Sequence, residues 1–129
     1  MTTQPSQHRI IPIYTSRGEA EAFLIFPYIF NRVGEWIGWA TPQREIYSVL
    51  GYYVGTLTND ARIVRKRSED DSSKPRLKPP PKPGKITTPA SIPLAPMMSD
   101  LTLSVIDVLQ DEPERLHAID SGEFRQDMD

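Results

Sequence analysis

The sequence predicts a mainly β fold: four short tandem β-hairpin repeats in a miniature propeller-like arrangement, followed by a proline-rich extended linker and a short α-helical tail. Three observations support this prediction. An Ile-aromatic pair followed by glycines recurs in the first half, eight prolines crowd between Ser72 and Pro96, and apolar residues at helical spacing follow them. We therefore expect a repeat domain at 1–71, a basic linker at 72–98 and an acidic helical tail at 99–129.

The repeat domain is predicted from four copies of one pattern. The copies begin, at offsets of 16, 17 and 17 residues, with Ile13-Tyr14, Ile29-Phe30, Ile46-Tyr47 and Ile63-Val64. A glycine follows each of the first three aromatic residues by four positions: Gly18, Gly34 and Gly51. A second glycine follows four residues later in two copies, as Gly38 and Gly55, where the first copy has Ala22. The fourth copy is cut short, with Ser68 in place of its glycine.

Each copy has the properties of a β-hairpin. An Ile-aromatic start favours a half-buried strand, the first glycine supplies the positive φ of a tight turn, and the second marks a bend or a close backbone approach. One hairpin cannot bury its apolar face alone, so copies around an axis would share a core. The N-terminal segment "RIIPI" is placed to complete the fourth copy by pairing with residues 62–67.

This pattern resembles the four-fold beta-flower domain of small bacterial proteins, over about Arg9 to Arg67. The resemblance implies a propeller-like assembly of hairpins and carries over no catalytic residue. The stretch "IPLAPMM" followed by an acidic helix resembles small cyanobacterial proteins with such a domain. That resemblance would place the chain at a photosynthetic complex.

The aromatic residues divide into two groups. Tyr14, Phe30 and Tyr47 recur at the repeat spacing, so we expect them in the shared core. Trp36, Trp39, Tyr52 and Tyr53 include adjacent strand positions, which point to opposite faces, so one or two should be exposed. An exposed aromatic side chain could be an anchor for a protein partner or an ordinary surface residue.

The linker should be extended. Consecutive prolines between Lys74 and Lys85 favour polyproline II. Such a segment could be a stiff spacer, could dock in an aromatic groove, or could lay its five cations along an acidic surface of a protein or lipid. It lacks the interleaved aromatic residues of single-strand nucleic-acid binders, so we expect no nucleic-acid partner.

The tail predicts an amphipathic helix. Ser99 is a good N-cap, and an apolar stripe follows at Leu101, Val105, Val108 and Leu109. Asp111 is expected to cap a second short helix that ends at Ser121-Gly122, with Leu116 and Ile119 as supporting contacts. A short helix is marginal alone, so the stripe must pack on its own repeat domain, on a second copy or in a partner's groove. The stiff linker favours the partner's groove.

The sequence predicts no catalytic chemistry and no cofactor or metal. The chain has no cysteine, which excludes disulfides, thiol catalysis and thiolate metal sites. It has no phosphate-binding loop, and His8 and His117 lie in segments without a candidate nucleophile. The acidic residues Asp107, Asp111, Glu112 and Glu114 lack calcium-loop spacing. The longest apolar run is about half the ~20 residues of a spanning helix, so we expect a soluble, cytoplasmic protein.

These features predict a non-catalytic adaptor, linker or assembly subunit. The β head would dock, with oligomers possible, and the arm and helix would extend onto a larger protein complex. The alternative is a small-ligand-binding β module with a central aromatic funnel and a regulatory tail.

Overall fold

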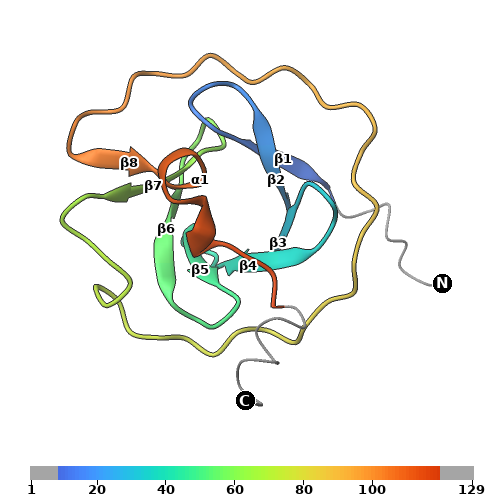
Figure 1. Cartoon of the computed structure of the whole chain (residues 1–129), viewed down its shortest axis with the longest axis horizontal. Coiled ribbons are helices and arrows are strands. Elements are labelled where there is room, and N and C mark those ends of the chain that lie inside the picture. The colour runs from blue at the N-terminus through green and yellow to red at the C-terminus, as the bar shows by residue number, and fades with distance from the viewer. Residues whose placement is uncertain (1–8, 120–129) are drawn as a thin grey trace.

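A computed structural model describes residues 9–119. They form one curled antiparallel sheet of eight strands that pair in sequence order, with a short helical segment over its middle (Figure 1). The elements are β1 (Ile11–Tyr14), β2 (Ala20–Ile25), β3 (Tyr28–Asn31), β4 (Trp36–Ala40), β5 (Glu45–Ser48), β6 (Tyr53–Leu57), β7 (Ile63–Lys66), β8 (Val105–Asp107), α1 (Val108–Asp111) and the 3₁₀ turn η2 (Pro113–Arg115). The prediction of a mainly β protein is confirmed.

The connections β1–β2, β3–β4 and β5–β6 contain turns of one kind, which run over the five residues 15–19, 31–35 and 48–52. In each, the fourth residue is a glycine with positive φ, 83° at Gly18, 87° at Gly34 and 92° at Gly51, whose N–H donates to the carbonyl of the first residue. The connections β4–β5 and β6–β7, at the opposite ends of the strands, contain turns with the same hydrogen bond but without glycine. There Arg44 and Ala61 adopt positive φ, at 70° and 65°.

The centre of the sheet is filled by the isoleucines that begin the copies. Ile13, Ile29, Ile46 and Ile63 are fully buried. The first three lie opposite small residues, Ala22, Gly38 and Gly55, each next to a shift in strand register. A Cβ on Gly38 would lie 2.7 Å from the Tyr47 carbonyl oxygen, and one on Gly55 would lie 2.6 Å from that of Val64. Both glycines therefore permit close approach of the next strand.

The partner of β7 comes from the far end of the chain. Strand β8 pairs antiparallel with β7, so that Val64 lies opposite Asp107 and Lys66 opposite Val105. The N-terminal strand β1 pairs with β2 instead of with residues 62–67. Its link to the end of the sheet is a hydrogen bond from the Tyr14 N–H to the Ala61 carbonyl, 2.8 Å long. The expected closure by "RIIPI" is therefore wrong, because β8 occupies that edge of β7.

The expected helix from Ser99 is also wrong. Of its apolar stripe, Leu101 lies outside any regular element, Val105 begins strand β8, and α1 has only four residues. Asp107 caps α1 by accepting a hydrogen bond from the Gln110 N–H, whereas Asp111 is the last helical residue. Strand β8 is followed directly by one helical turn. The apolar residues of these two elements together have the spacing of a single helical stripe, which is why the sequence pattern predicted one helix. The expected helix end at Ser121-Gly122 lies outside the described residues.

Residues 67–104, which we call the strap, circle the outer turns of the sheet (Figure 1). The Leu77 N–H donates to the Gly51 carbonyl at 2.9 Å, and the Ile86 N–H donates to that of Gly34 at 3.0 Å. Ala95 lies against Gly18, where an added Cβ would be 3.8 Å from the Ala95 Cβ. Successive contacts are nine residues apart, which is three turns of polyproline II.

The strap buries one face at a three-residue period. Every third residue is half-buried, except Ile92, which is slightly more exposed; the series is Lys74, Leu77, Pro80, Pro83, Ile86, Pro89, Ile92, Ala95, Met98 and Leu101. Polyproline II has three residues per turn, so this series forms one side of the strap. The other two sides face outward along most of its length.

Candidate functional site

The predicted partner-binding residues of the tail pack against their own chain. Val108, Leu109 and Leu116 are buried in the central core with the isoleucines of the sheet. Leu101, Val105 and Ile119 are half-buried, and Ile119 packs on the aromatic cluster described next. Residues 101–119 of the tail therefore pack on their own chain, and the residues named here form no free recognition helix.

Three of the four aromatic residues that we expected to divide between the two faces of the sheet are also buried. Trp36, Trp39 and Tyr53 form a cluster with Phe30, Tyr47 and Val49. The Trp36 Nε1–H donates to the Gly38 carbonyl at 2.7 Å, and the Trp39 Nε1–H donates to that of Ser48 at 3.0 Å. Burial raises the pKa of Tyr47 and of Tyr53 above the ordinary value for a phenol. Tyr14 is buried as well, and its hydroxyl donates to the Pro93 carbonyl of the strap.

Tyr52 is the exposed member of the four, with 39% of its surface accessible. The Arg76 guanidinium lies 4.8 Å from its ring centre. The Arg76 Nε–H also donates to the Leu50 carbonyl at 2.8 Å. The ring is thus a platform for the strap and is already engaged by a cation of its own chain.

A partly buried polar network joins the first turn, the turn between β6 and β7, the end of the strap and β8. The Arg62 guanidinium lies 2.7 Å from Asp60 and donates to the Ser16 hydroxyl and the Ser99 carbonyl. Asp107 accepts from both the Ser16 N–H and the Ser16 hydroxyl. Because Arg62 is paired with Asp60 and Ser16 links Arg62 to Asp107, the network fastens the end of the strap to the sheet.

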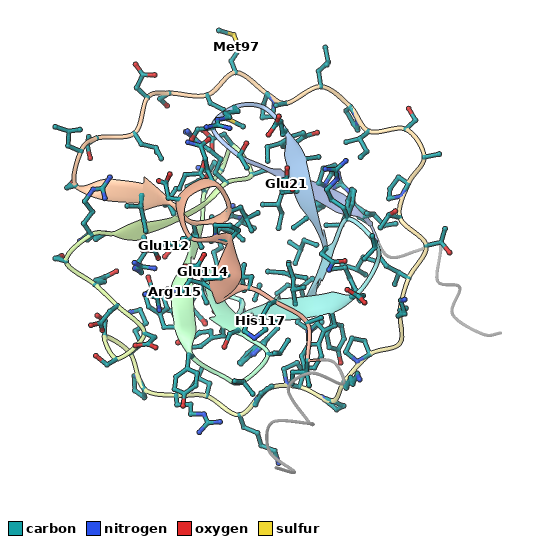
Figure 2. All side chains as sticks on the ribbon, in the orientation of Figure 1. Glu21, Met97, Glu112, Glu114, Arg115 and His117 are labelled. Atoms are coloured by element: carbon teal, nitrogen blue, oxygen red, sulfur yellow. The ribbon has the colours of Figure 1, made fainter. Side chains whose placement is uncertain are left out.

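A second ion pair fastens the segment over the sheet. Arg65 is buried and lies 2.9 Å from the Glu112 carboxylate, which Arg115 approaches at 3.3 Å. The Arg65 guanidinium beside it lowers the pKa of Glu112. Figure 2 shows Glu112, Glu114, Arg115 and His117 together above the middle of the sheet.

A polar cavity of about 490 Å³ lies between the end of the strap and α1. Its lining includes Arg62, Asp100, Asp107, Gln110 and Asp111. The Gln110 Oε1 is buried and has no hydrogen-bond partner within the described residues. Among residues 9–119, no group of three or more His, Cys, Asp or Glu side chains is arranged to hold a metal ion.

The outward sides of the strap differ along its length. Lys78, Lys82 and Lys85 are exposed, and no ion pair joins them to any residue between 9 and 119. Farther along, Leu94, Met97 and Leu103 are 96%, 98% and 90% exposed, and Figure 2 shows Met97 at the outer rim, pointing away from the molecule. Sequence reasoning missed these three residues; the three-residue period of the strap was the signal that could have identified its free sides.

No family model matches this sequence, and no curated protein or solved structure shows significant similarity to it. Within the described residues, none of the helical segments has the length and apolar character needed to cross a membrane.

Proposed function

We propose that this chain is a non-catalytic adaptor or assembly subunit whose strapped β head docks on a partner protein. In this proposal the four hairpins, with β7 and β8 as the last, are the blades of one miniature propeller-like unit of the beta-flower type. The recurring turns, register shifts and buried isoleucines support that arrangement. The strap and tail fasten the unit, so the surface offered to a partner is the outside of the strap.

One observation carries the proposal: the nearly complete exposure of Leu94, Met97 and Leu103. Leu94 and Met97 lie three positions apart, so a polyproline II strap presents them on one side, and Leu103 is exposed in the turn before β8. Single exposed apolar residues are ordinary, but exposed apolar residues gathered on one segment are typical of a contact surface. A fixed strap also loses little conformational entropy on binding.

The proposed partner is a protein with an aromatic-lined groove of the kind that reads polyproline II. Pro93 and Pro96 are exposed beside Leu94 and Met97, which gives two adjacent proline–apolar pairs. Their spacing of three residues places the two prolines on one outward side of the strap and Leu94 and Met97 on the other. The Tyr14 hydroxyl fixes the strap here through the Pro93 carbonyl, at 2.8 Å, so this surface is formed before the partner arrives.

The test is affinity capture from the native host with the full chain and with the variant Leu94→Asp/Met97→Asp. Both side chains are almost fully exposed, so the variant should keep the stability of the parent. Ser91→Asp, at another exposed position of the strap, is the matched control. We expect the parent and the control to retain a defined complex that the double variant loses. The captured partner, once purified, should bind the parent and the control again but not the double variant. Equal retention by all three chains would contradict the proposal.

A small-ligand-binding module is the second candidate, and the 490 Å³ cavity favours it, because its lining includes Gln110, whose buried Oε1 has no hydrogen-bond partner within the described residues. A volume of this size lies within the ~300–1,000 Å³ of small-molecule sites. The site would lie beneath the strap and not in a central funnel. Thermal-shift screening of the full chain and of Gln110→Leu tests it: a ligand that stabilises the parent alone supports this candidate, and a ligand that stabilises both chains equally argues against it.

A further inference from the structure

A second concave site lies on the cationic half of the strap. It is a pocket of about 220 Å³ between β4, the strap and the chain beyond η2, lined by Glu35, Trp36, Lys82, Pro83, Lys85, Ala118 and Ile119. We propose that this pocket binds an acidic peptide segment of a partner protein, taking one large apolar side chain onto Trp36 and Pro83 while Lys82 and Lys85 pair with flanking carboxylates. The inference rests on the proposed docking function and names the chemistry of a second contact.

The apolar floor of the pocket is fixed before any ligand binds. The Trp36 indole is held by its hydrogen bond to Gly38 and by the edge of Tyr28, whose ring centre is 6.1 Å away at 82°. The Tyr28 hydroxyl donates to the Pro81 carbonyl at 2.7 Å, and the Ile86 N–H is bound to Gly34. Both ends of the strap segment over the pocket are therefore anchored, which lowers the entropic cost of binding.

The size of the pocket favours a single side chain. Sites for drug-sized small molecules measure about 300–1,000 Å³, and this pocket is smaller. A phenylalanine or leucine side chain inserted from an extended peptide would bury its apolar surface there. This is the common peptide-recognition arrangement, in which a pocket accepts one anchor and neighbouring groups set specificity.

The charge around the pocket selects an acidic ligand. Residues 72–98 carry five basic and no acidic residues, and Lys82 and Lys85 are exposed, with no ion pair to any residue from 9 to 119. Glu35 is the acidic residue of the lining, and its carboxylate already accepts a hydrogen bond from the Asn31 amide at 3.1 Å. Two cations beside an apolar floor would attract and orient an anionic segment.

The spacing of the two lysines also fits a peptide. Three residues of polyproline II rise about 9 Å, so Lys82 and Lys85 stand on one side of the strap roughly that far apart. An extended peptide rises about 3.3 Å per residue. Carboxylates two or three positions apart, one on each side of the apolar anchor, can therefore reach both lysines.

The test is fluorescence anisotropy of the full chain with a labelled peptide that has one phenylalanine between two pairs of glutamates. We expect saturable binding that Lys82→Glu/Lys85→Glu weakens at least tenfold. Lys78→Glu, a charge reversal on the same strap outside the pocket lining, should change it less than threefold. A peptide with alanine in place of phenylalanine should also bind at least tenfold more weakly. Equal binding of the two peptides, or equal loss with Lys78→Glu, would overturn the inference in favour of unspecific charge attraction.

Residues 120–129 carry four acidic residues and Phe124, so the chain's own segment is the competing occupant. If the peptide binds Phe124→Ala but not the parent chain, that segment fills the pocket and the partner inference fails. The variant Leu94→Asp/Met97→Asp separates this result from the docking function, because it should bind the peptide normally. If no chain binds the peptide while the capture experiment succeeds, this inference fails alone.

Discussion

Gly34 satisfies two constraints at one position. Its φ of 87° lies in the left-handed region, and a Cβ there would overlap the Ile86 carbonyl oxygen of the strap. Gly51 has the same relation to Leu77. At both positions the turn requires positive φ, which glycine adopts without strain, and the missing side chain leaves room for the strap backbone. A substitution should therefore disturb both the turn and the strap.

We predict that Gly34→Ala lowers the free energy of unfolding by about 1–3 kcal/mol, from strain in the turn and displacement of the strap. Gly84→Ala is the matched control, because nothing lies within 4 Å of a Cβ at that strap position. It should change stability by less than about 0.5 kcal/mol. Urea unfolding midpoints of the two variants measure this difference, and equal midpoints would show that the strap does not rest on the turn.

Glu112 gives a pH-dependent prediction. Its pKa is lowered from the ordinary value of 4.5 by the guanidinium of buried Arg65, 2.9 Å from its carboxylate. The pair therefore stabilises the fold above about pH 4.5 and loses this contribution as pH falls through the lowered pKa of the folded state. Glu112→Gln should cost about 1–2 kcal/mol at pH 7 and little near pH 2. Glu114→Gln is the control, and a cost for Glu112→Gln that is the same at both pH values would contradict this account.

Among the elements, the three glycine turns could be predicted because glycine recurs at a fixed distance from each Ile-aromatic pair. The turns at Arg44 and Ala61 could not, since neither residue type marks positive φ. Strand β8 was missed because it has only three residues and because the whole strap separates it in the sequence from its partner β7. Patterns within a short window carry no information about such a pairing.

The candidate surfaces were predictable only in part. The cations of the linker were evident, but the fold decides which of them are free. Lys74 is paired with Glu45 at 3.3 Å and Arg76 lies on Tyr52, whereas Lys82 and Lys85 reach the pocket beside Trp36. That pocket joins three segments distant in sequence, so no local motif could indicate it.

The strap also gives a prediction at the scale of an element. Lys74, Lys78 and Lys82 precede proline, so the trypsin-sensitive bonds of this stretch are Arg76–Leu77 and Lys85–Ile86. Both bonds lie where a strap N–H is bound to a turn glycine, and local protection should make them resistant. We predict that Ile86→Ala speeds cleavage after Lys85 several-fold and leaves cleavage after Arg76 unchanged, as mass spectrometry of a time course would show. Cleavage that rises equally at both bonds would contradict separate anchoring.

At the scale of the whole molecule, we expect the head, the strap and residues 105–119 to form one folding unit. The core of the sheet includes Ile106, Val108, Leu109 and Leu116 from beyond the strap. Strand β8 covers the edge of β7, and an uncovered edge with an open core invites association. Head, strap and tail should therefore unfold together in one cooperative transition.

The most direct test of this claim is urea unfolding, followed by circular dichroism, of the full chain beside a version that ends at Asp71. The account predicts one sharp transition for the full chain and no cooperative transition for the shortened one, since the latter lacks β8 and the apolar residues that close the core. A shortened chain that unfolds cooperatively at the same midpoint would contradict it, and would show that the first 71 residues are an independent domain with a detachable tail.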